Sequence, residues 1–226
     1  MAPESRVSSH ASGESKPQRL AVRIAVAVAV VLWLAGVVLG TQFVWAYKTT
    51  PGVSAVAPAK WPGSKLVAPA VGRSTLVMFV HPLCSCTRAS LAELESVLRQ
   101  SDGRVSAWVM VLHPGGTSDE WQNSSTLAAA RHIPGVHLVM DTDGAEADRF
   151  RAATSGQVVL YDAQGELQFS GGITGARGHV GDNTGEARVV SFVNTGTADS
   201  HEHSVYGCGL HDPNPRTDPP AAGPTT

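Results

Sequence analysis

The chain has 226 residues, a formal net charge of -2 at pH 7 and only 16% charged residues. This length allows one ordinary domain with additional segments, and the absence of a basic stripe argues against a nucleic-acid partner. Three cysteines are too few for a disulfide scaffold, so a core must be stabilised mainly by burial of apolar side chains.

The N-terminal part of the chain divides into a polar tail and a long apolar segment. Residues 1–23 are predicted to be a cytoplasmic disordered tail, because most of them are polar or charged. Residues 24–47 contain no charged residue and exceed the roughly 20 apolar residues that a membrane-spanning helix needs. Basic residues precede this segment at Arg6, Lys16, Arg19 and Arg23, which places the N-terminus in the cytoplasm.

We therefore expect a single-pass protein of the inner membrane, with its C-terminal domain in the periplasm or otherwise outside the cytoplasm. A cleaved signal peptide is the alternative. Signal peptides usually have an apolar core of about 7–15 residues followed by a small-residue cleavage site. Only weak cleavage candidates occur, at 35–36 and 39–41, so the length of the segment favours a retained anchor.

The rest of the chain is predicted to contain a linker, one domain and a tail. Residues 48–72 carry four prolines among Ala, Gly and Val, which is typical of a semi-extended linker, with Trp61 expected to dock on the domain. Residues 73–210 alternate between strands and helices, which indicates an α/β or α+β three-layer domain, and residues 211–226 form a Pro-rich disordered tail. The expected strands are 75–80, 105–112, 136–140, 158–161 and 167–170, and the expected helices are 87–98, 118–132, 145–152 and 185–193.

Two cysteines lie between the first strand and the first helix of this domain. Cys84 and Cys86 follow the apolar run 75–80 and the strand-breaking residues His81 and Pro82, and they precede an amphipathic helix. The N-terminus of a helix carries partial positive charge, which favours a thiolate over a thiol. The pattern therefore predicts thiol chemistry at this turn.

Cys208 lies far along the chain, in a loop of sequence SVYGCGLHD. An odd cysteine in an oxidising compartment is a free thiol, an intermolecular bond or a third functional partner. Two roles remain open for it, resolving a mixed disulfide with Cys84 or Cys86 and stabilising the fold. No cofactor is expected for thiol exchange. As an alternative, the three cysteines together with His81 offer ligands for copper. Further candidate ligands near Cys208 are His201, His203 and His211.

This arrangement resembles the thioredoxin-like superfamily, in which a cysteine turn follows the first core strand and a β-hairpin with a final helix closes the fold. Three segments carry the resemblance: HPLCSCTRASLAEL, ATSGQVVLYDAQGELQFSGGITGARGH and VYGC. They are most similar to the membrane-anchored bacterial RedB-type thioredoxin-like proteins, over about residues 75–210. The resemblance implies a thioredoxin-like three-layer α/β/α domain behind an N-terminal transmembrane helix.

Two departures from thioredoxin concern the predicted site. The usual Cys-x-x-Cys is replaced by Cys84-Ser85-Cys86, and the smaller, more strained ring makes a disulfide easier to reduce. The thioredoxin cis-proline, which faces the cysteines, is matched here by Gly156. Glycine at this position implies less defined substrate docking and easier metal access. Together with His81 and Pro82, Gly156 is a candidate substrate-binding residue.

The sequence thus predicts a membrane-anchored, extracytoplasmic thiol–disulfide oxidoreductase that acts on a protein partner. Cys84, expected to be the more exposed cysteine, would attack; Cys86 would resolve the mixed disulfide, with Cys208 as an onward acceptor. Two alternatives stand beside it. The first is a copper-binding or copper-delivery protein using Cys84, Cys86, His81 and Cys208. The second is a non-catalytic thioredoxin-like binding domain with locked cysteines.

The glycine-rich loop 171–183 lacks the Gly-Lys-Ser/Thr ending of a phosphate-binding loop, so no nucleotide is expected. Its Arg177 and His179 are candidates to border the cysteine site. His113 and Asp141, at the ends of other predicted strands, are expected to be structural.

Overall fold

The computed structural model describes residues 16–116, 121 and 123–211, and the chain forms two compact units, residues 1–45 and 46–226. Parts of three predicted segments lie outside the described residues. These parts are residues 1–15 of the N-terminal tail, 118–120 and 122 of the second predicted helix, and 212–226 of the C-terminal tail.

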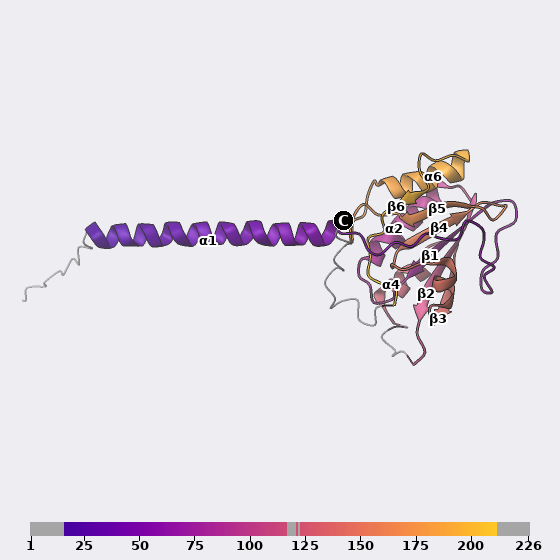
Figure 1. Ribbon diagram of the computed structural model, residues 1–226, viewed down its shortest axis with the longest axis horizontal. Coiled ribbons are helices and arrows are strands. Elements are labelled where there is room, and N and C mark those ends of the chain that lie inside the picture. The colour runs from indigo at the N-terminus through magenta and orange to yellow at the C-terminus, as the bar shows by residue number, and fades with distance from the viewer. Residues whose placement is uncertain (1–15, 117–120, 122, 212–226) are drawn as a thin grey trace, which may run out of the picture. The chain divides into compact units, whose positions relative to one another are not determined.

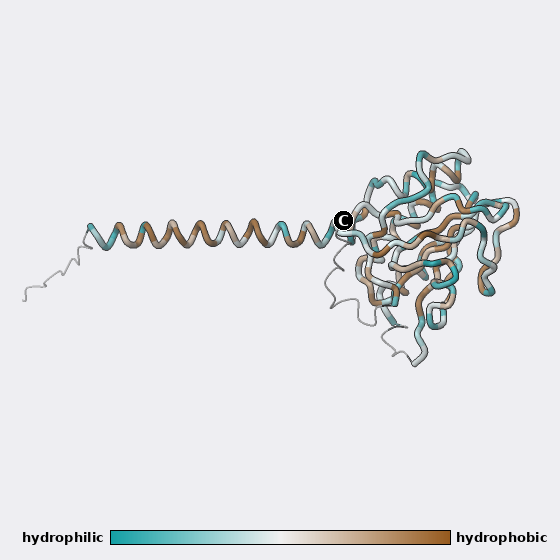
Figure 2. Tube along the Cα trace, viewed as in Figure 1, coloured by the Kyte–Doolittle hydropathy of each residue, from teal (hydrophilic) through white to brown (hydrophobic). Residues whose placement is uncertain are grey.

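Most of helix α1 (Lys16–Thr49) belongs to the first unit (Figure 1). Among the described residues it is the helix long and apolar enough to cross a membrane. Figure 2 shows hydrophobic residues along much of its length. The helix begins eight positions before the predicted span, which began at residue 24. The added residues include good helix formers, and Pro17 is tolerated because it lies in the first turn.

A six-stranded mixed sheet lies at the centre of the second unit (Figure 1). Its strand order is β3-β2-β1-β4-β5-β6. The first three strands are parallel, β4 is antiparallel to both β1 and β5, and the short β6 is parallel to β5. The strands are β1 (Ser74–Val80), β2 (Val105–His113), β3 (Val136–Thr142), β4 (Gln157–Tyr161), β5 (Leu167–Gly172) and β6 (Glu202–His203).

Alternate residues of β1 face two separate apolar cores, as the period of a strand requires. Leu76 and Met78 belong to a core shared with helices α2, α4 and α6, whereas Val77 and Phe79 belong to a second core shared with α5. The domain is therefore a three-layer α/β structure, as predicted. Its helices are α2 (Thr87–Gln100), α4 (Ser125–Arg131), α5 (Ala145–Phe150) and α6 (Thr184–Thr195).

The stretch 48–72, predicted to be a linker, differs from that expectation because much of it packs on the domain. Ala57 and Val67 are buried in the second core. Trp61 packs edge-on against Phe150 and Tyr161, at ring-centroid distances of 5.1 and 5.2 Å. The Trp61 backbone N–H also donates to the Gly165 carbonyl at 2.7 Å. The proline-rich stretch has no periodic pattern of apolar residues. Its backbone at residues 59–61 nevertheless pairs with residues 165–167 at the edge of the β4–β5 hairpin.

Residues 198–210, in which no strand or helix was predicted, pack along the β5 edge of the sheet. They first form β6 beside β5. Residues 205–210 then run beside residues 153–155. The Ser155 N–H donates to the Cys208 carbonyl at 2.8 Å and the Leu210 N–H donates to the Ala153 carbonyl at 2.9 Å. This pairing brings Cys208 to the turn that follows β1.

Candidate functional site

The turn after β1 holds the first two cysteines. The Cys84 backbone N–H donates to the His81 carbonyl at 3.1 Å, and the Thr87 N–H donates to the Cys84 carbonyl at 3.2 Å. Cys86 is the N-cap residue of α2, and its side chain makes no capping hydrogen bond there. The Cys86 sulfur is thus available to other partners near the positive end of the helix.

Cys84 and Cys208 meet across 124 positions of sequence, with their Sγ atoms 3.0 Å apart. All three cysteines are free thiols, and hydrogen bonding links Cys86 to both of the others. We refer to Cys84, Cys86 and Cys208 as the cysteine cluster. The expectation that Cys84 is the more exposed of the first two is wrong: it is 0% exposed, Cys86 is 8% exposed and Cys208 is half-buried. The reason is that Cys84 contacts the 205–210 segment, which the sequence did not place there.

The cluster has one favoured anion, on Cys84. Its hydrogen bond with Cys208 lowers the pKa of Cys84 far below the ordinary thiol value, a second bond with Cys86 acts in the same direction, and burial opposes both. The hydrogen bond with Cys84 is also the main reason that the pKa of Cys208 is raised. For Cys86, the bond with Cys208 lowers the pKa, but the bond with Cys84 and burial outweigh it and raise the pKa overall. Cys84 therefore ionises first and shares its charge with two neutral thiols.

Ser155, which the sequence reasoning missed, joins the cysteine turn to Cys208. Its Oγ accepts a hydrogen bond from the His81 N–H at 2.7 Å and lies 2.6 Å from the Thr87 hydroxyl, while its own N–H holds the Cys208 carbonyl. The close approach also needs Gly207, since a Cβ at that position would collide with the Ser155 carbonyl. The one sequence signal for Ser155 is its place next to Gly156, the position matched to the thioredoxin cis-proline.

Arg177 supplies a buried cation beside the cluster. Its guanidinium donates hydrogen bonds to the carbonyl oxygens of Gly207 and Thr50, and its backbone N–H donates to the Lys48 carbonyl at 2.9 Å. The guanidinium carbon also lies 5.3 Å from the centre of the Tyr47 ring. The charge of Arg177 acts to lower the pKa of Cys86, so Arg177 does border the site. The other candidate of this loop, His179, is exposed.

Gly156 occupies a position that only glycine fits without strain. Its φ is +91°, and an added Cβ would lie 2.7 Å from the Ser90 Oγ of α2. The Gly156 N–H donates to the Phe79 carbonyl at 2.7 Å, so this N–H is already occupied by a hydrogen bond to β1. Pro82 is buried, and the described part of the chain contains no cis peptide bond. Substrate binding by Pro82 and Gly156 stays a prediction.

The histidines considered as metal ligands point to other partners. The His81 ring is fully buried, accepts a hydrogen bond from the Leu83 N–H at 3.1 Å and lies 4.7 Å from the Trp121 ring. Within residues 16–116, 121 and 123–211, no group of three or more His, Cys, Asp or Glu side chains is arranged to hold a metal ion. The three late histidines pair with the Gln168 carbonyl (His201), the Gly172 carbonyl (His203) and the Asp148 carboxylate (His211).

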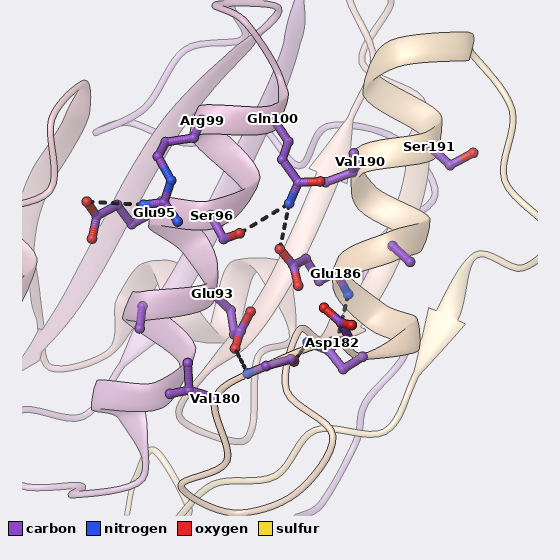
Figure 3. Close-up of a pocket in the computed structure, with 14 residues that line it drawn as sticks. Glu93, Glu95, Ser96, Arg99, Gln100, Val180, Asp182, Glu186, Val190 and Ser191 are labelled. Carbon is purple, nitrogen blue, oxygen red and sulfur yellow. Dashed lines mark hydrogen bonds and ion pairs between the residues drawn. The ribbon is translucent and has the colours of Figure 1, made fainter.

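A separate groove of about 650 Å³ lies between α2 and α6, and no cysteine lines it (Figure 3). Glu93 on α2 accepts a hydrogen bond from the Gly181 N–H at 2.6 Å. Glu186 on α6 accepts one from the Gln100 amide at 2.8 Å. Burial is the main cause of a raised pKa at Glu93, and the neighbouring Glu186 and Asp182 carboxylates raise it further. The groove is therefore acidic, and Glu93 ties the loop that follows Arg177 to α2.

The strand order, the parallel β1–β2 crossover, the β4–β5 hairpin and the final α6 define a thioredoxin-like fold, with a cysteine cluster at the end of its first strand. Among solved structures, the chain is similar to a hypothetical protein from Sinorhizobium meliloti, with 16% identity, 71% of this chain and 97% of that chain covered, and a TM-score of 0.56. An uncharacterised conserved protein from Geobacillus kaustophilus matches with 14% identity, 72% and 89% coverage, and a TM-score of 0.50.

A third structure, a secreted disulfide oxidoreductase from Mycobacterium tuberculosis homologous to Escherichia coli DsbE, has 14% identity, 55% and 82% coverage, and a TM-score of 0.39. No protein-family model matches the chain, and no curated protein matches it. Likenesses at these identities show the fold alone. The particular relation to RedB-type proteins therefore stays a prediction.

Proposed function

We propose that this protein is a membrane-anchored thiol–disulfide oxidoreductase whose exchanging pair is Cys84 and Cys208. The observation that carries the proposal is the 3.0 Å contact between their sulfurs. Sulfurs in contact can form a disulfide after a small rearrangement. This pairing revises the expected roles, because a Cys84–Cys86 bond would have to close a strained ring. Cys86 becomes the neighbouring thiol that stabilises the Cys84 anion.

The electrostatics of the cluster support exchange over a purely structural bond. A thiolate held by hydrogen bonds stabilises the reduced form of the pair, and this stabilisation makes the corresponding disulfide more oxidising. The pKa of Cys84 is lowered by Cys208 first and by Cys86 second. A structural disulfide would gain nothing from such an arrangement.

The proposed location is the outer face of the inner membrane, with the N-terminus in the cytoplasm. Helix α1 supports an anchor, since it is long and apolar enough to span a bilayer. Basic residues before the span support this orientation. An oxidising compartment is also where a thiol–disulfide pair persists, and there we propose a protein with exposed cysteines as the partner.

The proposal is tested by equilibrating the full chain in detergent with glutathione buffers and counting trapped thiols by mass spectrometry. We expect a midpoint within roughly -270 to -120 mV, the range of thiol–disulfide enzymes. Cys86→Ser should keep the disulfide and Cys208→Ser should lose it. A bond that survives Cys208→Ser but not Cys86→Ser would contradict the assignment. A midpoint below about -300 mV would indicate a structural bond and a domain that only binds.

Copper(I) binding is a second proposal, supported by the two soft sulfur donors of Cys84 and Cys208, whose Sγ atoms lie 3.0 Å apart. His81 is a weaker candidate ligand than the sequence suggested, because its ring contacts Leu83 and Trp121. Anaerobic titration of the reduced full chain with Cu(I) against a chelator tests this proposal. Retention of one equivalent that is lost in Cys208→Ser would support it, and a lack of competition would eliminate it.

A further inference from the structure

We propose that a partner thiolate attacks the Cys208 sulfur and that Cys84 is the leaving group, so that the oxidised protein donates its disulfide to protein dithiols. This inference rests on the proposed Cys84–Cys208 pair and adds the direction of exchange. It also reverses the role that the sequence suggested for Cys84, which was to attack a partner.

Access decides which sulfur is attacked. Cys84 is 0% exposed, and its backbone carbonyl is held by the Thr87 N–H and by the Thr126 hydroxyl. Cys208 is half-buried, lies in the 205–210 segment and is flanked by two glycines, of which Gly209 is exposed. The flanking residues therefore have no side chains to block an approaching thiolate. An incoming protein chain can reach Cys208 and cannot reach Cys84.

Cys84 is identified as the leaving group by the hydrogen-bond donors that still surround its sulfur after the disulfide has broken. Disulfide exchange is faster when the departing thiol has a low pKa. The Cys84 pKa is lowered most by Cys208 and next by Cys86, with smaller contributions from the Thr87 hydroxyl and the Cys208 backbone N–H. While the Cys208 sulfur is bound to a partner, Cys86, Thr87 and the Cys208 backbone remain to stabilise the departing thiolate.

The step balances as follows. The partner thiolate forms a bond to the Cys208 sulfur, the Cys84–Cys208 bond breaks, and its electron pair stays on Cys84. A second partner thiolate then attacks the partner's bonded sulfur and releases Cys208, which takes up a proton. The partner dithiol is oxidised by two electrons, the Cys84–Cys208 pair is reduced by two, and an external disulfide re-forms the pair.

The inference can be tested with reduced glutathione as the attacking thiol, because trypsin separates Cys84 and Cys86 from Cys208 by cleaving after arginine residues. Trypsin cleavage after Arg73 and Arg88 leaves Cys84 and Cys86 on peptide 74–88, and cleavage after Arg188 and Arg216 leaves Cys208 on peptide 189–216. The full chain in detergent is oxidised with diamide, desalted, exposed briefly to limiting glutathione, quenched in acid and alkylated. Mass spectrometry then locates the glutathione.

We expect glutathione on peptide 189–216 in excess over peptide 74–88, on the order of tenfold. Equal labelling, or an excess on 74–88, would overturn the inference while leaving the proposed function intact. Failure of the oxidised protein to link the two peptides before glutathione is added would instead refute the proposed pair. Cys86→Ser is the matched control: the excess on 189–216 must persist in this variant, because the Cys86 sulfur stabilises the departing Cys84 thiolate but forms and breaks no bond in the first step.

Discussion

The Nη1 atom of Arg177 donates a hydrogen bond to the carbonyl oxygen of Gly207, the residue directly before Cys208. The same guanidinium holds the Thr50 carbonyl and faces the Tyr47 ring. One buried cation thus fixes both the entry of the chain into the domain and the segment that carries the half-buried Cys208. Arg177 acts on the site by positioning Cys208 and by its charge.

Replacing Arg177 with methionine should therefore affect both stability and thiol chemistry. The buried Gly207 carbonyl and the half-buried Thr50 carbonyl lose their donor, and we expect the free energy of unfolding to fall by about 1–3 kcal/mol. Loss of the positive charge should also raise the pKa of Cys86, which Arg177 acts to lower. The checks are urea unfolding in detergent and the pH profile of alkylation on peptide 74–88 of the reduced chain.

Arg177→Lys is the matched control, since it keeps the charge without the geometry of the guanidinium. It should lose stability like the methionine variant, but its pH profile of alkylation should stay closer to that of the wild type, because the positive charge remains. If Arg177→Met changed neither measurement, the positioning role would be refuted.

Gly156→Ala tests whether the position matched to the cis-proline tolerates any side chain. Its φ of +91° is unfavourable for an L-residue, and the new Cβ would press on the Ser90 Oγ. We expect a loss of about 2–3 kcal/mol in the free energy of unfolding. Gly178→Ala is the control, because Gly178 has a φ of +66° and open space around it. Adding Ser90→Ala should recover part of the loss, and a Gly156→Ala chain no less stable than the control would contradict this account.

The acidic groove predicts a pH dependence of stability. Burial and the Glu186 and Asp182 carboxylates raise the pKa of Glu93 from its ordinary value of 4.5. The folded chain therefore binds a proton that the unfolded chain has released, and stability declines as the pH rises through this window. Glu93→Gln removes the titrating group and should flatten the decline that sets in as the pH rises above the ordinary value of 4.5. Urea unfolding at several pH values measures this dependence. Glu95→Gln, which removes a half-buried carboxylate paired with Arg99 on the same helix, is the control and should follow wild type.

The sequence predicted the elements that have a local pattern. The apolar run before the cysteines is β1, the helical spacing from Leu91 to Leu98 is α2, and the turn residues 162–166 join the β4–β5 hairpin. These elements were sufficient to predict the order of strands and helices along the chain up to α6 and the place of the cysteine turn, whereas the short β6 was missed. The prediction succeeded where neighbours in the chain determine the structure.

The rest depends on contacts between distant segments that carry no periodic signal. The backbone of residues 205–210 pairs with residues 153–155. Backbone hydrogen bonds of this kind can form with many different side chains, so no residue pattern in the sequence reveals the pairing. The burial of Cys84 and the central role of Ser155 follow from that pairing. The packing of residues 52–67 was missed for the same reason, because prolines and alanines indicate a linker equally well.

The proton count of the Cys84–Cys208 pair is the most direct consequence of its electrostatics. The lowered pKa of Cys84 and the raised pKa of Cys208 mean that, near neutral pH, the reduced pair holds one thiolate and one thiol. Reduction by two electrons then takes up one proton, so the midpoint potential should fall by about 30 mV per pH unit. Two ordinary thiols would give about 59 mV per pH unit below their pKa.

Because the pKa of Cys84 is depressed, this stabilisation of the reduced pair is present at neutral pH and disappears only as the pH falls through that pKa. Glutathione equilibrations of the full chain at a series of pH values from about 5.5 to 8, all below the ordinary thiol pKa, measure the slope. Thr87→Val removes a minor hydrogen bond to Cys84 and should shift the potential while keeping the slope. A slope near 59 mV would mean that Cys84 is protonated in the reduced protein, and Cys84 would then lose its advantage as the leaving group.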